Sequence, residues 1–139
     1  MTKSNGLQDY YMHLEEFRLH SFNTWPFDDD WICTPQKLAE AGFYHCPTDQ
    51  EPDAVCCFMC FKELDGWEPT DDPWEEHKRH SPQCPFLKLD KPMEELTVEQ
   101  FMKLEVKRQK NQVVKIMNAK KKEFEEQAKA VREEMQRLV

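Results

Sequence analysis

Glycine and long apolar runs are both scarce in this chain. Its 139 residues contain only three glycines, and its nine prolines all lie between Pro26 and Pro92. No stretch approaches the roughly 20 consecutive apolar residues that a transmembrane helix needs, and the first residues lack the apolar segment of a secretory signal. We therefore expect a protein of the nucleus and cytoplasm that neither crosses nor binds a membrane.

Several residue types are absent from the end of the chain. Glycine and proline do not occur after Pro92, serine and threonine do not occur after Thr97, and all six cysteines lie within residues 33–84. A compact unit of this size is marginal on its hydrophobic core alone, so we expect a bound metal to supply part of its folding free energy. The predicted organisation is an extension over residues 1–14, a zinc domain over 15–90, a linker over 91–97 and a long amphipathic helix over 98–139.

Basic residues are scarce in the first two thirds of the chain. Residues 1–92 hold 18 acidic and 8 basic side chains, whereas residues 93–139 hold 9 and 11. A domain this acidic repels the phosphates of nucleic acids and favours a cationic partner, such as a peptide with a free amino terminus. We therefore expect no direct binding of nucleic acid.

The middle third of the chain carries side chains that bind metals. Cys57 and Cys60 are separated by two residues, a spacing that lets two thiolates converge on one ion. A distant histidine and cysteine would complete a tetrahedral zinc site. Because four protein ligands leave no open position for water or substrate, this pattern predicts one structural zinc ion, no catalytic residues and no enzyme activity.

The sequence offers more candidate ligands than one zinc ion needs. Adjacent Cys56 would point to the opposite face of a strand, which favours Cys57 as the partner of Cys60. Spacing alone does not decide between His77 and His80, since both precede Cys84 by a plausible distance. The remaining cysteines, Cys33, Cys46 and Cys56, are most simply interpreted as buried small apolar residues.

Cap, proline and turn signals predict short elements in the zinc domain. Thr34, Pro35 and Gly42 are typical of the start and end of a short helix, and the aromatic run from Phe17 indicates an earlier helix ending near Trp25-Pro26. Asp72-Pro73 begins a third helix, which carries His77. Strands are expected at 43–45 and 55–61, with a hairpin turn at Asp65-Gly66. The fold class is therefore α+β with a small antiparallel sheet.

The last third of the chain reads as one continuous helix. Thr97 and Gln100 match a capping box, and apolar residues recur at steps of three and four from Val98 onward. A helix of this length spans about 60 Å and exposes an apolar stripe that normally binds other helices. The predicted partner-helix face consists of Val113, Met117, Phe124, Val131, Met135 and Leu138.

Several motifs together resemble the baculoviral inhibitor-of-apoptosis repeat (BIR) family. These motifs are the segment Arg18–Pro26, the triplet Ala41–Phe43, and the zinc pattern with Gly66-Trp67 and Glu76-His77. The chain from about Leu14 to its end is similar to members with a single repeat and a long carboxy-terminal helix. The resemblance implies the BIR fold: a zinc-bound, three-stranded antiparallel sheet with short helices, followed by one long helix. It also implies that His80 is free and that the zinc ligands are Cys57, Cys60, His77 and Cys84.

The residues beside the cysteine pair suit capture of a peptide amino terminus. Asp65 and Asp71 can pair with an α-ammonium group, while Leu64 and Trp67 can wall a pocket for a small first side chain. Glu63 lies on the same segment. The resemblance implies the same function, because repeats of this family bind peptides that begin with alanine.

A phosphate farther along the same peptide is the second expected ligand group. Lys62 and His80 supply positive charge and hydrogen-bond donors in an otherwise acidic surface. The resemblance implies that these two residues read the phosphothreonine of an amino-terminal histone tail. It also implies that Glu51 lies near the arginine that precedes this phosphothreonine.

The resemblance further implies a set of partners and locations. It indicates a non-enzymatic adaptor of the chromosomal passenger complex, which acts at the centromere and then at the spindle midzone and midbody during chromosome segregation and cytokinesis. The long helix would bind helices of borealin and the inner centromere protein, and aurora kinase would be bound indirectly. The alternative is an apoptosis inhibitor that binds caspases or their mitochondrial antagonists through the same groove.

Two further predictions concern the flanks of the domain and its threonines. The resemblance implies a homodimer of the free protein, and we predict phosphorylation at Thr34, which precedes a proline, and at Thr48, which precedes acidic residues. The predicted dimer interface consists of Leu7, Tyr10, Met93, Leu96, Val98, Phe101 and Met102.

Overall fold

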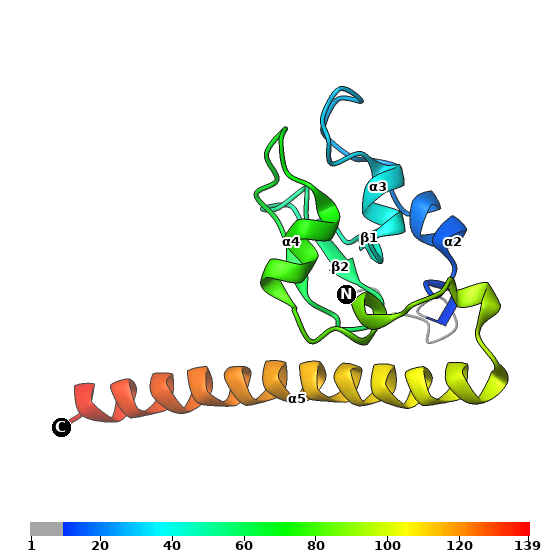
Figure 1. Cartoon of the computed structure of the whole chain (residues 1–139). Helices are drawn as coiled ribbons and strands as arrows, with labels where there is room; N and C mark the ends of the chain where they lie inside the picture. Colours follow the sequence, from blue (N-terminus) through cyan, green and yellow to red (C-terminus); the bar gives the residue numbers. More distant parts are fainter. Residues whose placement is uncertain (1–9) are drawn as a thin grey trace.

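The structure is a computed structural model that describes residues 10–139, so predicted dimer residue Leu7 lies outside the described residues. The short elements gather into one domain, and the last helix runs beneath it and continues beyond it (Figure 1). In chain order the elements are α2 (Glu15–His20), α3 (Pro35–Glu40), β1 (Phe43–His45), β2 (Val55–Cys57), β3 (Glu63–Leu64), α4 (Pro73–His80), the 3-10 turns η1 (Pro85–Lys88) and η2 (Met93–Glu95), and α5 (Val98–Arg137).

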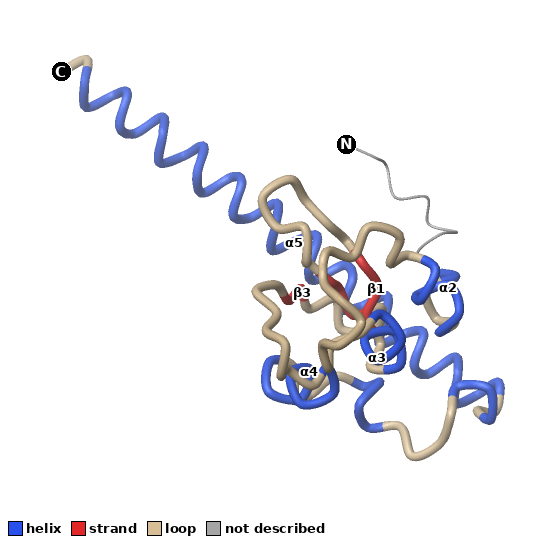
Figure 2. Tube along the Cα trace, turned by 90° about the horizontal axis from the view of Figure 1, so that it is seen from above, coloured by secondary structure: helices blue, strands red, loops and turns tan. Residues whose placement is uncertain are grey.

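The sheet has three antiparallel strands in the order β1-β2-β3 (Figure 2). Phe43 faces Cys57 across the first pair, and Val55 faces Leu64 across the second. The predicted α+β class with a zinc-site sheet and short helices is confirmed. The core lies between this sheet and the helices, and its large side chains are at most 1% exposed: Leu38, Phe43, Val55, Phe58 and Met59.

Arg18 fixes α2 against the rest of the domain. Its side chain is 3% exposed, and it donates hydrogen bonds to the carbonyl oxygens of Ala39, Met12 and His13 at 2.9 to 3.0 Å. The guanidinium group lies 4.7 Å from the ring centre of Phe58. Burial lowers the pKa of Arg18 to about 10, although nearby acidic groups oppose this shift. The buried guanidinium group therefore joins α2 and the residues just before it to Ala39 and to Phe58, which are distant in sequence.

The strand predicted over 55–61 is present but shorter, since β2 spans Val55–Cys57, and the predicted hairpin turn at Asp65-Gly66 is wrong. β2 ends at Cys57 because the chain turns immediately afterward. The amide of Phe61 donates to the carbonyl of Cys57, and the amide of Cys57 donates to the carbonyl of Lys62. Phe61 adopts a φ of 61°, in the left-handed region. The turn between β2 and β3 is therefore formed by residues 57–62, which carry Cys57 and Cys60 (the cysteine knuckle), and Gly66 follows β3 and is not part of this turn.

The predicted first helix is present as α2, but its predicted end near Trp25-Pro26 is wrong, because α2 ends at His20. The hydroxyl of Ser21 donates to the carbonyl of Arg18 and accepts a hydrogen bond from the amide of His45 at 2.8 Å. This contact turns the chain toward β1. The following aromatic residues form an irregular segment, in which Trp25 meets Phe22 and Phe27 edge to face and Phe27 stacks on Trp31.

α5 begins at Val98 with the predicted capping box, in which Thr97 accepts from the amide of Gln100 and Gln100 accepts from the amide of Thr97. Its first half packs against the domain. Leu104 is 8% exposed and belongs to the core cluster, and Asn111 donates to the carbonyl of Met59 at 3.2 Å. The helix is therefore part of the domain's packing up to about its middle.

A buried polar cluster also joins α5 to the domain. The Glu105 carboxylate lies 2.7 Å from His13 Nε2 and accepts two hydrogen bonds from Arg108, at 2.6 and 2.9 Å. Burial acts to raise the pKa of Glu105, but the hydrogen bonds from Arg108 and Gln109 outweigh burial and lower the pKa to about 2. These polar residues face the domain, not the solvent. Among residues 10–139, no helix is both long and apolar enough to cross a membrane.

Candidate metal centre and peptide-binding groove

The four predicted zinc ligands gather at one point between the knuckle, α4 and the start of η1. Their ligand atoms all lie within 4.8 Å of one another. The Sγ atoms of Cys57 and Cys84 are 3.8 Å apart, and Cys60 Sγ is 3.6 Å from His77 Nε2. A tetrahedral zinc site has edges of roughly 3.8 Å between sulfurs and roughly 3.6 Å between sulfur and nitrogen, given bond lengths of about 2.3 and 2.0 Å. The cluster therefore fits one zinc ion.

Surrounding backbone groups orient these ligands. His77 Nδ1 donates to the carbonyl of Ala41 at 2.7 Å, which leaves Nε2 to bind a metal. The amides of Met59 and Cys60 point at Cys57 Sγ from 3.4 and 3.5 Å. Burial raises the pKa of the Cys57 thiol well above its ordinary value, with a further increase from its neighbouring thiols. Metal binding must therefore displace protons, and acid opposes it.

The remaining cysteines lie away from this centre. Cys33 and Cys56 are buried and Cys46 is half-buried. The alternative ligand His80 lies on the exposed side of α4, where it lines a different cavity. Because the four clustered ligands close a tetrahedron, the metal would hold the knuckle against α4 and would not present an open coordination position to a substrate.

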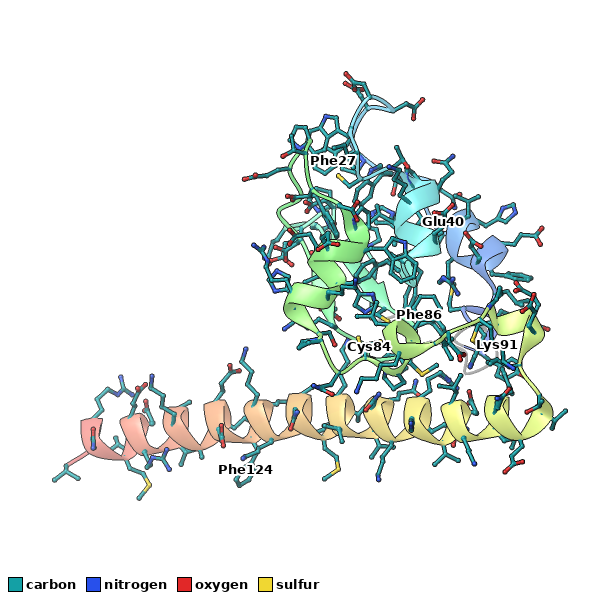
Figure 3. All side chains as sticks on the ribbon, in the orientation of Figure 1. Phe27, Glu40, Cys84, Phe86, Lys91 and Phe124 are labelled. Atoms are coloured by element: carbon teal, nitrogen blue, oxygen red, sulfur yellow. The ribbon has the colours of Figure 1, made fainter. Side chains whose placement is uncertain are left out.

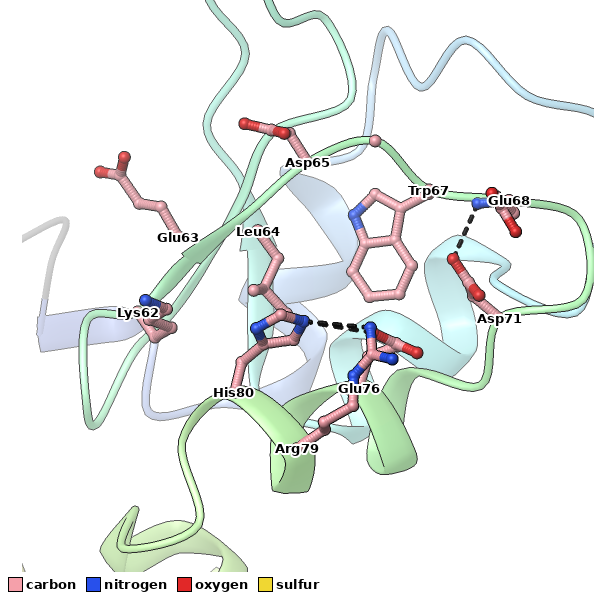
Figure 4. A pocket seen from close by; sticks show the side chains of 11 residues that line it. Lys62, Glu63, Leu64, Asp65, Trp67, Glu68, Asp71, Glu76, Arg79 and His80 are labelled. Atoms are coloured by element: carbon pink, nitrogen blue, oxygen red, sulfur yellow. Dashed lines mark hydrogen bonds and ion pairs between the residues drawn. The ribbon is translucent and has the colours of Figure 1, made fainter.

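A groove of about 580 Å³ lies beside the metal centre, between β3, the loop that follows it and α4 (Figure 4). Seven of the eight predicted peptide-binding residues line it: Lys62, Glu63, Leu64, Asp65, Trp67, Asp71 and His80. Glu51 is not among the lining residues. However, Glu51 interacts with the lining residue Asp65, because a hydrogen bond between the two carboxyl groups and their mutual repulsion raise the pKa of Glu51. Two adjacent carboxylates favour a cationic ligand group.

The cationic side chains Lys62 and His80 lie away from Asp71 in the groove, although Glu63 and Glu76 also line it. Asp71 lies next to Trp67, and Lys62 lies across the groove near His80 (Figure 4). One oxygen of Asp71 accepts from the amide of Glu68 at 2.8 Å, which fixes the carboxylate. The Trp67 side chain is buried and its amide donates to Asp53 at 2.9 Å. Its indole Nε1 has no hydrogen-bond partner among the described residues.

Three charged residues that line this groove were not predicted from the sequence: Glu68, Glu76 and Arg79. Arg79 donates to Glu76 at 2.7 Å, and His80 Nε2 lies 3.3 Å from Arg79 and 3.4 Å from Glu76. The His80 ring nitrogen can therefore accept from Arg79 or donate to Glu76. Helical spacing was the available signal, because Glu76 lies one turn before His80 on α4 and Arg79 directly precedes it.

The other predicted residues lie on separate surfaces. Val98 is 80% exposed, Met102 53% and Tyr10 44%, whereas Met93, Leu96 and Phe101 are half-buried. All six residues of the predicted partner-helix face are exposed, Phe124 by 70%. Thr34 accepts from the amide of Lys37 as the cap of α3, and Thr48 accepts from the amide of Glu51. Both candidate phosphorylation sites thus also stabilise a local turn.

Comparison with known proteins gives consistent results. The family model "Inhibitor of Apoptosis domain" (BIR) matches residues 18–88. Baculoviral IAP repeat-containing protein 5 of Mus musculus is 53% identical over 131 residues, covering 94% of each chain. Protein 5.2-B of Xenopus laevis is 50% identical over 121 residues, covering 87% of this chain and 77% of the relative. The DIAP1 BIR1 domain bound to a Grim peptide aligns with a TM-score of 0.49 and 39% identity, covering 55% of this chain and 73% of that chain.

Proposed function

The chain belongs to the BIR family of inhibitor-of-apoptosis proteins, and on that premise we propose that it is a non-enzymatic adaptor that binds the phosphothreonine-bearing amino-terminal tail of a histone. Its near full-length relatives are proteins of the survivin type. In this proposal the protein serves the chromosomal passenger complex in chromosome segregation and cytokinesis. It acts at the centromere, and later at the spindle midzone and midbody.

The observation that carries the proposal is the separation of charge along the groove. The α-ammonium of the peptide would lie against Asp71 and Asp65, with its alanine side chain between Leu64 and Trp67. The arginine at the second position would lie toward the paired carboxylates of Glu51 and Asp65. Each ligand charge then meets the opposite charge.

The phosphate would lie at the other end of the groove. Lys62 is exposed and makes no ion pair among residues 10–139, so its ammonium group is available. His80 and Arg79 supply further donors, and a guanidinium can bind two phosphate oxygens at once. Arg79 would have to leave Glu76 to do so, and this exposed ion pair costs little to break.

A second part of the proposal concerns α5. Its outer face is apolar and exposed, which supports binding to helices of borealin and the inner centromere protein and, through the latter, to aurora kinase. The exposed Val98, Met102 and Tyr10 support a homodimer of the free protein. Partner helices that extend along α5 as far as residues 98–102 would compete with the homodimer for that surface.

The alternative function is inhibition of apoptosis by binding caspases or their mitochondrial antagonists. The amino-terminal half of the groove supports it, because Leu64, Trp67 and Asp71 would accept an alanine-first peptide whether or not it carried a phosphate. The exposed apolar stripe of α5 favours the adaptor function over inhibition of apoptosis. Capture of a peptide amino terminus in the groove would not need this stripe, whereas an adaptor would use it to bind partner helices.

Calorimetric titration with phosphorylated and unphosphorylated histone-tail peptides tests the proposal. We expect phosphorylation to strengthen binding about tenfold or more, as expected for charge-assisted hydrogen bonds of about 1.5–3 kcal/mol. Lys62→Ala, His80→Ala and Arg79→Gln should each reduce this preference and leave unphosphorylated binding nearly unchanged. Lys78→Gln, on the same helix but outside the groove, is the matched control. Equal affinity for both peptides would exclude phosphate reading.

A further inference from the structure

A second groove, lined by lysines, lies between η1 and the first half of α5. Its volume is about 410 Å³. Figure 3 shows this part of the chain, around Cys84 and Phe86, lying directly over the helix. The lining residues come from two segments that are distant in sequence: Gln83, Pro85, Lys88 and Leu89 from one, and Leu104, Lys107, Lys110 and Asn111 from α5.

The three lysines of this groove have no acidic partners among the described residues. Lys88 Nζ donates to the neutral side chain of Gln83 at 2.7 Å. Lys107 and Lys110 form no ion pair within residues 10–139, whereas two other lysines of α5, at 103 and 115, pair with glutamates. The groove therefore concentrates uncompensated positive charge on a chain whose formal net charge is −8.

The groove also has an apolar floor. Leu104 is 8% exposed, Leu89 and Pro85 are half-buried, and the exposed Lys88 and Lys107 lie at the edges. Lysines around an apolar floor suit a ligand that carries both carboxylates and apolar side chains.

The position of the lysines on α5 connects the groove with the exposed apolar stripe. Leu104 and Asn111 face the domain, while Val106 and Val113 are 63% and 53% exposed. At 3.6 residues per turn, Lys107 and Lys110 lie between these two faces. A helix lying along the stripe would therefore have one edge over the groove.

We propose that this lysine groove binds the acidic edge of an amphipathic segment of a partner protein. Three cations in a short groove are too few to offset the repulsion of nucleic acid by residues 1–92, which hold 18 acidic and 8 basic side chains.

A second copy of this chain fits the lysine groove less well than a partner protein does. The exposed loop with Asp28, Asp29 and Asp30 lies at the opposite end of the domain from α5 (Figure 1), so pairing it with the groove would produce open-ended chains. The proposal does not depend on what the peptide-binding groove binds.

Fluorescence anisotropy tests the proposal with a synthetic amphipathic peptide that has glutamates along one edge of a leucine stripe. A second peptide carries glutamine at those positions. We expect the full zinc-loaded chain to bind the glutamate peptide more tightly and to lose this preference as salt is added, because exposed charges are screened over about 10 Å at 0.1 M. The double variant Lys107→Glu/Lys110→Glu should weaken binding about tenfold or more, since each tenfold loss corresponds to about 1.4 kcal/mol.

The matched control is Lys122→Glu/Lys129→Glu, which changes the net charge equally on the exposed second half of α5, on the face opposite the apolar stripe. It should leave affinity for the glutamate peptide within about twofold. If both double variants lost the same affinity for the glutamate peptide, net charge alone would attract the peptide. If the wild-type chain bound both peptides equally, the lysine groove would not be a binding site for acidic segments. If a DNA duplex bound to these lysines more tightly than the peptide, the ligand of the groove would be nucleic acid. If the chain self-associated and Lys107→Glu/Lys110→Glu abolished that self-association, the ligand would be a second copy of the chain. Circular dichroism and zinc content establish that the variants fold.

Discussion

At the scale of single residues, two glycines with positive φ differ in what surrounds them. Gly42 has a φ of 97°, and a Cβ built there would lie 2.9 Å from Cδ1 of Phe86. Gly66 has a φ of 70°, and a Cβ there would meet nothing within 4 Å. Both positions strain an L-residue, but only Gly42 also lacks room, because Phe86 is held between Phe58 and Trp74.

Gly42→Ala should therefore destabilise the domain by about 2–4 kcal/mol, from backbone strain of about 1–2 kcal/mol together with overpacking. Gly66→Ala is its control and should lose only the strain. Urea unfolding followed by tryptophan fluorescence measures both. Equal losses would show that Phe86 yields without cost.

The identity of the histidine ligand is also decided at this scale. His77 and His80 lie on one short helix, and their spacing to Cys84 is acceptable in both cases. In the structure His77 is fully buried and its ring is oriented by the carbonyl of Ala41, whereas His80 is exposed in the peptide-binding groove. The sequence could not distinguish them, because the carbonyl that orients His77 comes from a residue 36 positions earlier.

At the scale of elements, α5 has two halves with different roles. The first half packs on the domain through Leu104, the buried pair of Glu105 and Arg108, and Lys115, which donates to the carbonyl of Phe61 and to Glu63. The second half has no contact of this kind within the described residues. Its apolar residues Met117 and Phe124 are 63% and 70% exposed.

Glu105→Gln should weaken the docking of α5 and destabilise the protein by about 1–3 kcal/mol at neutral pH, the cost of removing a buried charged acceptor. Because the pKa of Glu105 is lowered from 4.5 to about 2, its contribution is fully present above pH 4.5 and disappears as the pH falls toward 2. The difference in unfolding free energy between wild type and variant should stay constant from neutral pH down to about pH 5 and shrink below pH 4.5.

Acid also protonates the zinc ligands, so the two proteins must be measured side by side at each pH. Glu99→Gln, an exposed glutamate in the first turn of the same helix, is the control and should change stability little. A difference that already declines between pH 7 and pH 5 would contradict the lowered pKa.

Phe124→Asp and Val131→Asp should abolish binding of partner helices and leave the domain intact. Both side chains are exposed, so the free protein loses little by either change, whereas an apolar interface would have to bury a carboxylate. Co-purification of co-expressed partner helices measures the loss, and zinc content and thermal unfolding should match wild type. Glu125→Lys is a control for charge on the same segment. Persistent co-purification would show that another face of α5 is used.

At the scale of the whole molecule, a small sheet depends on the metal centre for its connection to α4. The knuckle supplies two ligands, and α4 and the start of η1 supply the other two. Removing the metal would leave two buried thiols, the half-buried thiol of Cys60 and a buried histidine facing one another, with nothing to replace the bonds to zinc.

A strong chelator should therefore unfold the domain, and one equivalent of zinc per chain should restore it. Tryptophan fluorescence reports the unfolding because Trp67 is 6% exposed in the folded domain. Cys84→Ser should lose zinc and fold poorly, whereas Cys46→Ser, at a half-buried cysteine outside the centre, should retain both. A chelated chain with an unchanged fluorescence spectrum would mean that the hydrophobic core is sufficient.

Local signals predicted α3, α4 and α5 because caps, prolines and apolar spacing act within a few residues. Thr34, Asp72 and Thr97 each cap the helix expected from them. The errors arose where distant contacts override such signals. Ser21 ends α2 by accepting from the amide of His45, and the knuckle converts the end of an apparent strand into the turn between β2 and β3.

Residue type and short-range spacing were enough to predict the fold class, the cysteine ligands of the metal centre and the long helix, but not which histidine completes that centre. Only the tertiary structure decided how Glu76, Arg79 and His80 are grouped in one groove. It also decided that the polar residues of α5 face the domain, and that three lysines from two distant segments share a second groove. These features follow from burial and from contacts between segments, which local sequence patterns do not encode.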